Sequence, residues 1–339
     1  MGIDIAPIDR ADQAAIDEAY RIRAATDAAD VPDFPPLCRR RFEAAIRHPM
    51  PGIEVVAALA RLDGVPAGYL RLDLPRLDNT DNASLDLAVH PAHRRRGVGR
   101  ALHGHCVRLL RERGRKRVYA PAVSALPGGP ERHGAGGAFA AAAGARPALA
   151  EVRRRLDPTR LDQAALDGLL ADARSRAAGY RVVRWYGHTP VEYEADVAYL
   201  DGRLVADMPL GDLEWEPENI DVERLRGTER ALDARGRRRY HQGAVHVASG
   251  RLVAWTLLDV GASAPWHAFQ RITIVDPDHR GRRLGLLTKI ENLRYALAHE
   301  PELRAVDTFN AAANARMIAI NERLGYRPVD GWTDWQLTI

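Results

Sequence analysis

The sequence predicts an α+β protein made of two tandem domains of the same kind. Its 339 residues exceed the ~100–200 residues of a typical domain, so we expect two domains, each with its own core. Residues 87–102 recur as residues 273–288 at a constant offset of 186 residues, and the same order of predicted strands and helices surrounds both copies. A repeat with the length of a domain indicates a duplicated domain rather than a solenoid. The identical pairs are Val89/Val275, Pro91/Pro277, His93/His279, Arg94/Arg280 and Gly99/Gly285.

The composition is that of a globular protein and excludes a disordered chain. Hydrophobic residues make up 46% and charged residues 28%, and 49 basic residues against 45 acidic ones leave a net charge of only +4. So small an excess does not indicate nucleic-acid binding. The two cysteines, Cys38 and Cys106, exclude a disulfide framework and favour a reducing compartment. We find no signal peptide and no apolar run near the ~18 residues of a membrane span, so we expect a cytoplasmic monomer or homodimer without membrane contact.

In the first half, periodicity predicts the elements one by one. Alternation predicts a strand over residues 3–8, and helical spacing predicts helices over 12–25 and 35–48. Residues 53–61 and 65–73 flank Asp63-Gly64, which predicts a hairpin. Residues 84–89 form the strand before the repeated motif, and 97–113 form a helix that ends at Gly114. A strand over 117–120, a helix of small residues near 137–143 and a strand pair ending at 152–156 follow.

The second half repeats this order. We predict a strand over 180–185, helices over 191–200 and 221–234, strands over 240–247 and 251–260 around Ser249-Gly250, and a strand over 270–275. The helix over 283–299, the strand over 305–308, the helix over 311–324 and strands around 327–330 and 332–339 complete it. A helix over 161–177, capped by Asp162 or Thr159, is expected to join the halves. The predicted domains are therefore residues 1–157 and 179–339, with a linker over 158–178.

The repeated motif is suited to binding phosphate. A strand leads into Val-x-Pro-x-x-Arg-x-x-Gly-x-Gly, and a long helix follows. A glycine-rich turn at a helix N-terminus points backbone N–H groups outward, and the helix dipole adds to their attraction for anions. Arg94, Arg95, Arg96 and Arg100 can neutralise a pyrophosphate. A loop with solvated arginines is the alternative, which the strand, the helix and the duplication disfavour.

Residues 89–99 resemble the acyl-CoA pyrophosphate loop of the GNAT N-acetyltransferases. Residues 310–326, an Asn-containing helix that ends in Leu-Gly-Tyr, resemble a later motif of that family. The pairing of two such domains is similar to the tandem subfamily that includes mycothiol synthase. The resemblance implies that each domain is a mixed, mostly antiparallel sheet flanked by helices and splayed where acyl-CoA inserts. It implies acetyl-CoA or another acyl-CoA as cofactor, no metal, and transfer of the acyl group to the amine of a small molecule. The residues it assigns to the cofactor are Leu87, Ala88, Val89, Arg94, Arg95, Arg96, Gly97, Val98, Gly99, Arg100, Ile274, Val275, Arg280, Gly281, Arg282, Arg283, Leu284, Gly285 and Asn310.

The two halves differ in their polar residues. The first loop matches the family pattern, but its later helix carries Ala140 where many members have a tyrosine, and only Asp86 and His90 are candidate acid–base groups nearby. The second loop has Arg283 in place of the glycine aligned with Gly97, where we expect right-handed backbone geometry. We therefore predict cofactor binding in the first domain and acyl transfer in the second. The candidate catalytic residues of the second domain are Thr273, Asp307, Asn314 and Asn321.

Several of these assignments have alternatives. Asp307 is either the general base or a carboxylate at a strand end paired with an arginine. Asn310 and Asn314 fit positioning of the cofactor or a helix start, and the sequence also permits a non-catalytic acyl-CoA-binding protein or a modifier of proteins. His103 and His105 point to different faces of a helix and make a poor metal pair. Histidines 241, 246 and 267 are individually expected to be structural, and the arginine runs at 39–41, 153–155 and 237–239 are expected to be solvated.

Overall fold

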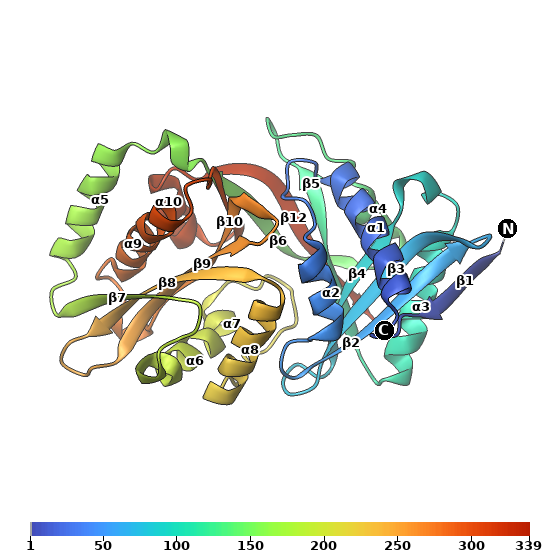
Figure 1. The fold of residues 1–339 in the computed structure, drawn as a ribbon, viewed down its shortest axis with the longest axis horizontal. Coiled ribbons are helices and arrows are strands. Elements are labelled where there is room, and N and C mark those ends of the chain that lie inside the picture. The colour runs from blue at the N-terminus through green and yellow to red at the C-terminus, as the bar shows by residue number, and fades with distance from the viewer. Residues whose placement is uncertain (1) are drawn as a thin grey trace. The chain divides into compact units, whose positions relative to one another are not determined.

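The computed structural model describes residues 2–339, which divide into two compact units (Figure 1). Unit 1 comprises the chain up to Glu151 together with Leu210–Glu216 and Asp330–Ile339. Unit 2 comprises Val152–Pro209 and Pro217–Val329. The sequence prediction gave all of residues 179–339 to the second domain, whereas the structure assigns the last ten residues to unit 1.

Unit 1 contains a mostly antiparallel sheet that opens at one place. Its strands are β1 (Ile3–Pro7), β2 (Ile53–Leu62), β3 (Val65–Pro75), β4 (Asn82–Val89), β5 (Arg117–Ala125) and β12 (Arg327–Thr338), adjacent in that order. Only β4 and β5 pair in parallel, and their pairing ends at Ser84 and Tyr119. Beyond these residues the two strands separate, which leaves the opening between them.

Alternation along β3 places helices on both faces of this sheet. Tyr69 packs with helices α1 (Gln13–Asp30) and α2 (Arg39–Arg47), whereas Leu70 and Leu72 pack with helix α3 (Val98–Glu112). Successive strand residues point to opposite faces, so α1 and α2 cover one face and α3 the other. A further helix, α4 (Ala135–Ala142), packs against β5, and its Phe139 approaches Gly99 of α3.

Unit 2 repeats this arrangement. Its strands follow the order β6 (Arg146–Leu156, of which unit 2 holds the part from Val152), β11 (Ala305–Ala311), β10 (Ala264–Val275), β9 (Leu252–Gly261), β8 (Arg237–His246) and β7 (Tyr180–Tyr186). The parallel pair is β10 and β11, joined from His267 to Phe269. The main helices are α5 (Gln163–Ser175), α6 (Glu194–Gly202), α7 (Leu204–Asp207), α8 (Val222–Ala234), α9 (Leu284–His299) and α10 (Ala315–Arg323). Asp162 caps α5, as the sequence predicted as one of two options.

The last strand of the chain completes the sheet of unit 1. Residues 330–338 of β12 pair antiparallel with residues 125–117 of β5 (Figure 1). The sequence predicted two short strands at the end of each half, and the structure has one long strand in each place, β6 and β12. The break predicted near Gly331 does not occur, because its backbone continues the pairing with β5.

Two of the three arginine runs are buried rather than solvated as predicted. Arg153 is fully buried and Arg239 nearly so, while Arg39 remains exposed. The buried guanidinium groups pair with carboxylates: Arg237 with Asp259, Arg239 with Asp233, and Arg153 with Asp307. Burial of a charge requires such a partner, which a sequence run does not reveal.

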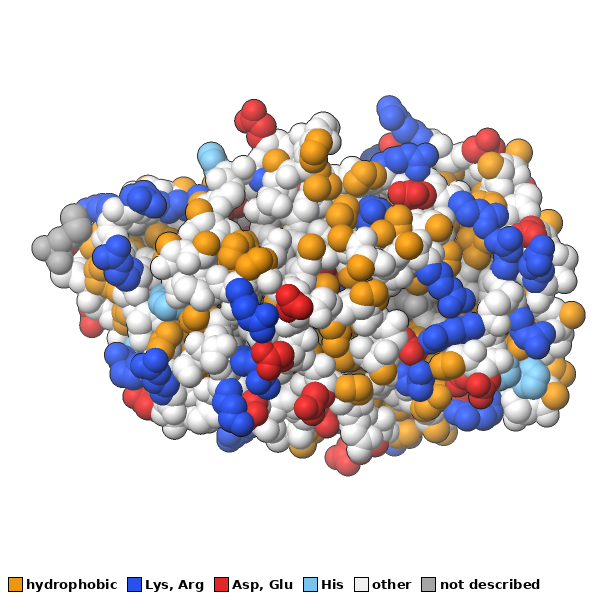
Figure 2. Space-filling view, turned by 180° about the vertical axis from the view of Figure 1, so that it is seen from behind, with side chains coloured by type: hydrophobic (Ala, Val, Ile, Leu, Met, Phe, Trp, Pro, Cys, Tyr) orange, Lys and Arg blue, Asp and Glu red, His pale blue; other side chains and the backbone are white. Residues whose placement is uncertain are grey.

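Charges of both signs are spread over the surface. On the face shown in Figure 2, basic and acidic side chains are interspersed rather than gathered into one field, consistent with the net charge of +4. Among residues 2–339, no helix is long and apolar enough to cross a membrane.

Candidate functional site

Unit 1 contains a pocket where β4 and β5 separate. The pocket has a volume of about 390 Å³ and reaches both faces of the sheet. On the face covered by α3 its wall includes Leu87, His103 and Phe139, and on the face covered by α1 it includes Asp27 and Asp86. The strand opening is therefore a passage between two faces, which is what a reaction between two ligands arriving from opposite sides requires.

The strand that ends the chain forms one wall of this pocket. Trp332, Trp335 and Leu337 of β12 line it. Because β12 pairs with β5 along residues 330–338, the last ten residues of the chain belong to the site as well as to the sheet.

The phosphate loop predicted from the sequence lies at the start of α3. Pro91–His93 form one turn of 3-10 helix, and Gly97 then precedes the helix with a left-handed φ of 88°. Gly99 lies against Phe139, because a Cβ on Gly99 would come 3.3 Å from that ring. The loop is thus adjacent to the wall of the pocket, and the N–H groups of the first turn of α3 are free of helical partners.

Both loops have the same backbone path. Each contains two left-handed residues: Arg95 and Gly97 in unit 1, and Gly281 and Arg283 at the aligned positions in unit 2, with Arg283 at φ 54°. The prediction of right-handed geometry at Arg283 is therefore wrong. The loop has to reverse direction at that position whichever residue occupies it, although left-handed backbone costs a non-glycine residue roughly 1–2 kcal/mol.

The loops differ in the cations that remain available. Arg94 is held by both oxygens of Asp30 at 2.8 Å and its Nε donates to the Val89 carbonyl, so it anchors the loop. Arg280 does the same in unit 2 with Asp207 and the Val275 carbonyl. Within the described residues, Arg95, Arg96 and Arg100 are exposed and have no carboxylate partner.

In unit 2 the corresponding cations are fewer. The aligned residues are Gly281, Arg282 and Leu286, and only Arg282 is charged; it lies over the ring of Tyr180 at 5.8 Å. Arg283 pairs with Asp172 at 2.9 Å. The loop of unit 1 therefore offers more free positive charge to a phosphate than the loop of unit 2.

The pocket of unit 1 is lined by alanines whose counterparts in unit 2 are large. Aligning Gly144 with Gly325, which are both left-handed, matches Ala140, Ala143 and Ala145 with Asn321, Leu324 and Tyr326. The three alanines line the pocket, whereas the three larger side chains are buried, with at most 3% of their surface exposed. Similarly, His103 lines the pocket while the aligned Lys289 is buried beside Tyr326, and burial lowers the pKa of Lys289 to about 7. Large buried side chains thus occupy in unit 2 the positions that line the pocket in unit 1.

Three charged side chains of α1 face the pocket. Arg23, Asp27 and Asp30 are spaced three and four residues apart and so lie on one face of the helix. The guanidinium of Arg23 donates to one oxygen of Asp27, and its Nε lies 3.1 Å from one oxygen of Asp86 on β4. Burial raises the pKa of Asp27, although the Arg23 cation opposes this shift.

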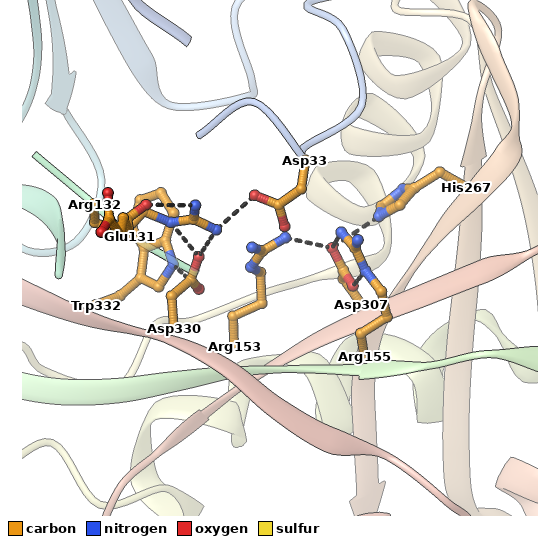
Figure 3. A network of polar contacts seen from close by, with 9 residues as sticks. All are labelled: Asp33, Glu131, Arg132, Arg153, Arg155, His267, Asp307, Asp330 and Trp332. Atoms are coloured by element: carbon orange, nitrogen blue, oxygen red, sulfur yellow. Dashed lines mark hydrogen bonds and ion pairs between the residues drawn. The ribbon is translucent and has the colours of Figure 1, made fainter. Parts of the chain in front are cut away.

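Asp307, the base predicted for the second domain, lies in a buried ion cluster of unit 2 (Figure 3). It accepts hydrogen bonds from Arg153 at 3.0 Å, from Arg155 at 2.6 and 2.8 Å, and contacts Nε2 of His267 at 2.9 Å. Burial alone would raise its pKa, but hydrogen bonds from Arg155 and His267 hold the pKa well below its usual range. A carboxylate so held is a weak proton acceptor, which favours the alternative of a structural pairing with arginine.

The other polar residues predicted for unit 2 also have structural partners. Asn314 caps α10 by accepting from the Met317 N–H, Asn321 donates to Asn310 at 2.7 Å, and the hydroxyls of Thr273 and Thr256 are 2.8 Å apart. The apolar loop residues Ile274 and Leu284 are buried, whereas Val275 and Gly285 are partly exposed. These contacts give Asn314, Asn321 and Thr273 structural partners within unit 2.

A second ion cluster fixes the β12 end of unit 1 (Figure 3). Arg132, with 1% of its side chain exposed, contacts Asp33 at 2.5 Å and Asp330 at 2.7 Å. The indole N–H of Trp332 donates to the other oxygen of Asp330 at 2.8 Å. These bonds hold Trp332 in the wall of the pocket.

Comparison with known proteins identifies the fold and the family. A solved structure described as a tandem GNAT protein from the clavulanic acid biosynthesis pathway (without AcCoA) is 34% identical, with a TM-score of 0.83, over 99% of this chain and 98% of that one. The chain belongs to the GNAT acetyltransferase family. A family model described as Acetyltransferase (GNAT) family also matches residues 17–126, all within unit 1. These findings confirm the resemblance and the tandem α+β fold predicted from the sequence.

More distant structures share only the fold of this GNAT protein. A GCN5-related N-acetyltransferase from Sphaerobacter thermophilus is 17% identical with a TM-score of 0.63, covering 99% of this chain and 95% of that one. A glucosamine N-acetyltransferase region of a fungal multi-domain β-N-acetylglucosaminidase is 13% identical with a TM-score of 0.69, covering 99% of this chain and 38% of that one. Among the curated proteins compared, none matches.

The motifs of the sequence do not reveal the part of the candidate site that comes from α1, β3 and β12. Asp86 was noted, but Arg23, Asp27 and Arg71 were not, and neither were Trp332 and Trp335. One available signal was the spacing of Arg23 and Asp27, which places both on one helix face. His90, also noted as a candidate, accepts from the Ala92 N–H through Nδ1 and caps the turn before the loop. Within residues 2–339, no group of His, Cys, Asp and Glu side chains is arranged to hold a metal ion.

Proposed function

We propose that unit 1 binds acyl-CoA and transfers its acyl group to the amine of a small molecule. One observation carries this proposal: the pocket opens where β4 and β5 separate, and it lies beside a loop with three exposed arginines that form no ion pair in the described residues. The assignment of transfer to unit 1 departs from the expectation of the sequence, which placed it in the second domain.

The residues of unit 1 fit acyl-CoA in both charge and shape. Arg95, Arg96 and Arg100 and the N-terminus of α3 suit the phosphates. The apolar wall made by Leu87, Phe139 and the alanines of α4 suits an uncharged chain. Acyl-CoA supplies an activated thioester carbonyl, and backbone N–H groups of β4 freed by the strand opening are suited to stabilise the oxygen as it becomes negative.

Transfer to an amine places two further demands on the protein. The amine has to be held in line with the thioester and has to lose a proton before it attacks. The face of the pocket covered by α1 carries the charged groups Arg23, Asp27, Arg71 and Asp86, so we assign the acceptor to that face. Cofactor and acceptor would then approach the opening from opposite faces of the sheet.

Unit 2 is proposed to act as a structural partner. Its equivalent volume holds Asn321, Leu324 and Tyr326, and Asp307 is engaged by three side chains. The 34% identity to a tandem GNAT protein of clavulanic acid biosynthesis supports a small-molecule acceptor from secondary metabolism rather than a protein.

Two measurements on the full chain test this function. Native mass spectrometry with acetyl-CoA is expected to show one bound molecule per chain, and none in the Gly97→Val variant. Release of CoA is then followed with a panel of primary amines. Retained binding in Gly97→Val would overturn the location, and the binding of acetyl-CoA without CoA release for any amine would support a non-catalytic binding protein instead.

A further inference from the structure

We propose that Asp27 is the general base that deprotonates the acceptor amine, and that Arg23 and Asp86 position it. This inference rests on the proposed function of unit 1. It concerns a residue on α1, outside the loop and the late helix that define the family resemblance.

The geometry begins with one arginine shared by two carboxylates. Arg23 reaches Oδ1 of Asp27 through Nη1 and Oδ1 of Asp86 through Nε at 3.1 Å. Asp27 comes from α1 and Asp86 from β4, so the guanidinium fixes two elements of the wall relative to each other. For Asp27 and Asp86, the contact with Arg23 engages one oxygen of each carboxylate, Oδ1.

The net charge of this group suits an ammonium ion. Two carboxylates and one guanidinium leave one negative charge, and all three side chains line the pocket while 25–29% of each side chain is exposed. Asp30 also lines the pocket, but Arg94 occupies both of its oxygens. Likewise, Arg71 is directed to Asp73, with Nε and Oδ1 3.1 Å apart. The carboxylates that remain available to bind an amine are therefore those of Asp27 and Asp86.

The surroundings of Asp27 suit a base. Burial raises its pKa, Asp86 and Asp30 raise it further, and Arg23 and Arg41 lower it, with a net rise. A more basic carboxylate accepts a proton from an ammonium ion more readily, which is how enzymes adapt carboxylates to this task. Tyr69, buried on β3 at the back of this wall, stays neutral because burial raises its pKa as well.

The reaction step balances without another reagent. The ammonium gives one proton to Asp27, and the neutral nitrogen attacks the thioester carbon. The C–N bond forms, the C–S bond breaks, and the second nitrogen proton leaves with the sulfur as free CoA. Asp27 then returns its proton to water.

Two amines with the same carbon skeleton but different basicity distinguish a general base from a structural carboxylate. Ethylamine is protonated at neutral pH, whereas trifluoroethylamine is largely neutral and needs no base before it attacks. With acetyl-CoA, Asp27→Asn is expected to lower kcat for ethylamine by about 10²–10⁴-fold, as loss of a general base does. For trifluoroethylamine, the same variant is expected to match the wild type.

Three controls complete the experiment. Asp27→Glu is expected to restore part of the ethylamine rate. Asp86→Asn is expected to raise KM for ethylamine more than it lowers kcat, and Asp17→Asn, on the far part of α1, is expected to change neither. The KM for acetyl-CoA is expected to stay constant in all of these variants. Equal losses for both amines in Asp27→Asn, or no loss for either, would overturn the role of Asp27. If the wild type bound acetyl-CoA but released CoA with no primary amine of the panel, the proposed function itself would fail, and with it this inference.

Discussion

Gly97 and Arg283 occupy the same left-handed position at the start of equivalent helices, with φ angles of 88° and 54°. The loop shape is therefore common to both units, although only one of them uses glycine there. The two residues differ in the space and the charge that they leave at the start of the helix. Gly97 carries no side chain at the helix start, whereas the side chain of Arg283 pairs with Asp172.

Exchange of these two residues tests whether the open backbone matters for binding. Because unit 2 tolerates arginine at this position, Gly97→Arg is expected to fold, with a loss of roughly 1–2 kcal/mol for left-handed backbone. Its affinity for acetyl-CoA is expected to fall, since the added side chain covers the loop. Arg283→Gly is the matched control and is expected to leave affinity unchanged. Isothermal titration of both variants with acetyl-CoA measures these affinities. An affinity of Gly97→Arg equal to that of the wild type would contradict a role of the open backbone in binding.

Removal of the free arginines tests the electrostatic part of the site. A hydrogen bond to a charged group contributes about 1.5–3 kcal/mol, so we expect the Arg95→Ala, Arg96→Ala, Arg100→Ala triple variant to bind acetyl-CoA at least about tenfold more weakly. The wild-type affinity is expected to fall with added salt, and the variant to respond less. Arg282→Ala in unit 2 serves as the control. Loss of affinity in that control but not in the triple variant would place the phosphates at the other loop.

Filling the alanine wall tests whether the pocket is the binding site. The double variant Ala143→Leu, Ala145→Tyr gives unit 1 the residues that close unit 2. We expect acetyl-CoA binding to be lost while the melting temperature of the free protein stays within a few degrees of wild type, as read by thermal unfolding with and without acetyl-CoA. Conversely, Tyr326→Ala is expected to destabilise unit 2 by about 3–5 kcal/mol through an empty cavity. A filled variant that is still stabilised by acetyl-CoA would exclude this pocket.

Because Asp307 lies in a buried ion cluster, its substitution is expected to lower the stability of the protein rather than to remove a catalytic group. In Asp307→Asn the buried Arg153 loses a charged partner, and breaking such a buried pair costs about 3–5 kcal/mol. Because the pKa of Asp307 is lowered in the folded state, its contribution is complete above about pH 4 and is lost as the pH falls below that value. The stability difference between wild type and variant, measured by denaturant unfolding, should therefore shrink in acid. A variant of unchanged stability that has lost acyl transfer would instead support Asp307 as the base.

Local features of the fold could be predicted from the sequence, and long-range ones could not. The strand, loop and helix around Gly97 and Gly99 were predictable because proline, glycine and helical periodicity act over a few residues. The pairing of β12 with β5 was not predictable from the sequence, since the partner of a strand lies elsewhere in the chain. Arg23 and Asp27 could not be assigned to the site for a related reason, because their spacing is also that of an ion pair on a solvated helix. That they line a pocket follows only from the opening between β4 and β5. From the sequence, Ala140 in place of a tyrosine indicates a missing acid–base group, whereas in the structure Ala140, Ala143 and Ala145 leave the space of the pocket.

The most direct measurement of where acyl-CoA binds is photoaffinity labelling of the full chain, followed by peptide mapping. The probe is an acyl-CoA with a photoreactive group in a short acyl chain, and excess acetyl-CoA serves as competitor. Binding in unit 1 predicts competed labels within residues 84–87, 118–145 and 332–337, the segments that line the pocket. Competed labels within residues 270–326, with none in unit 1, would contradict the account and return the reaction to unit 2.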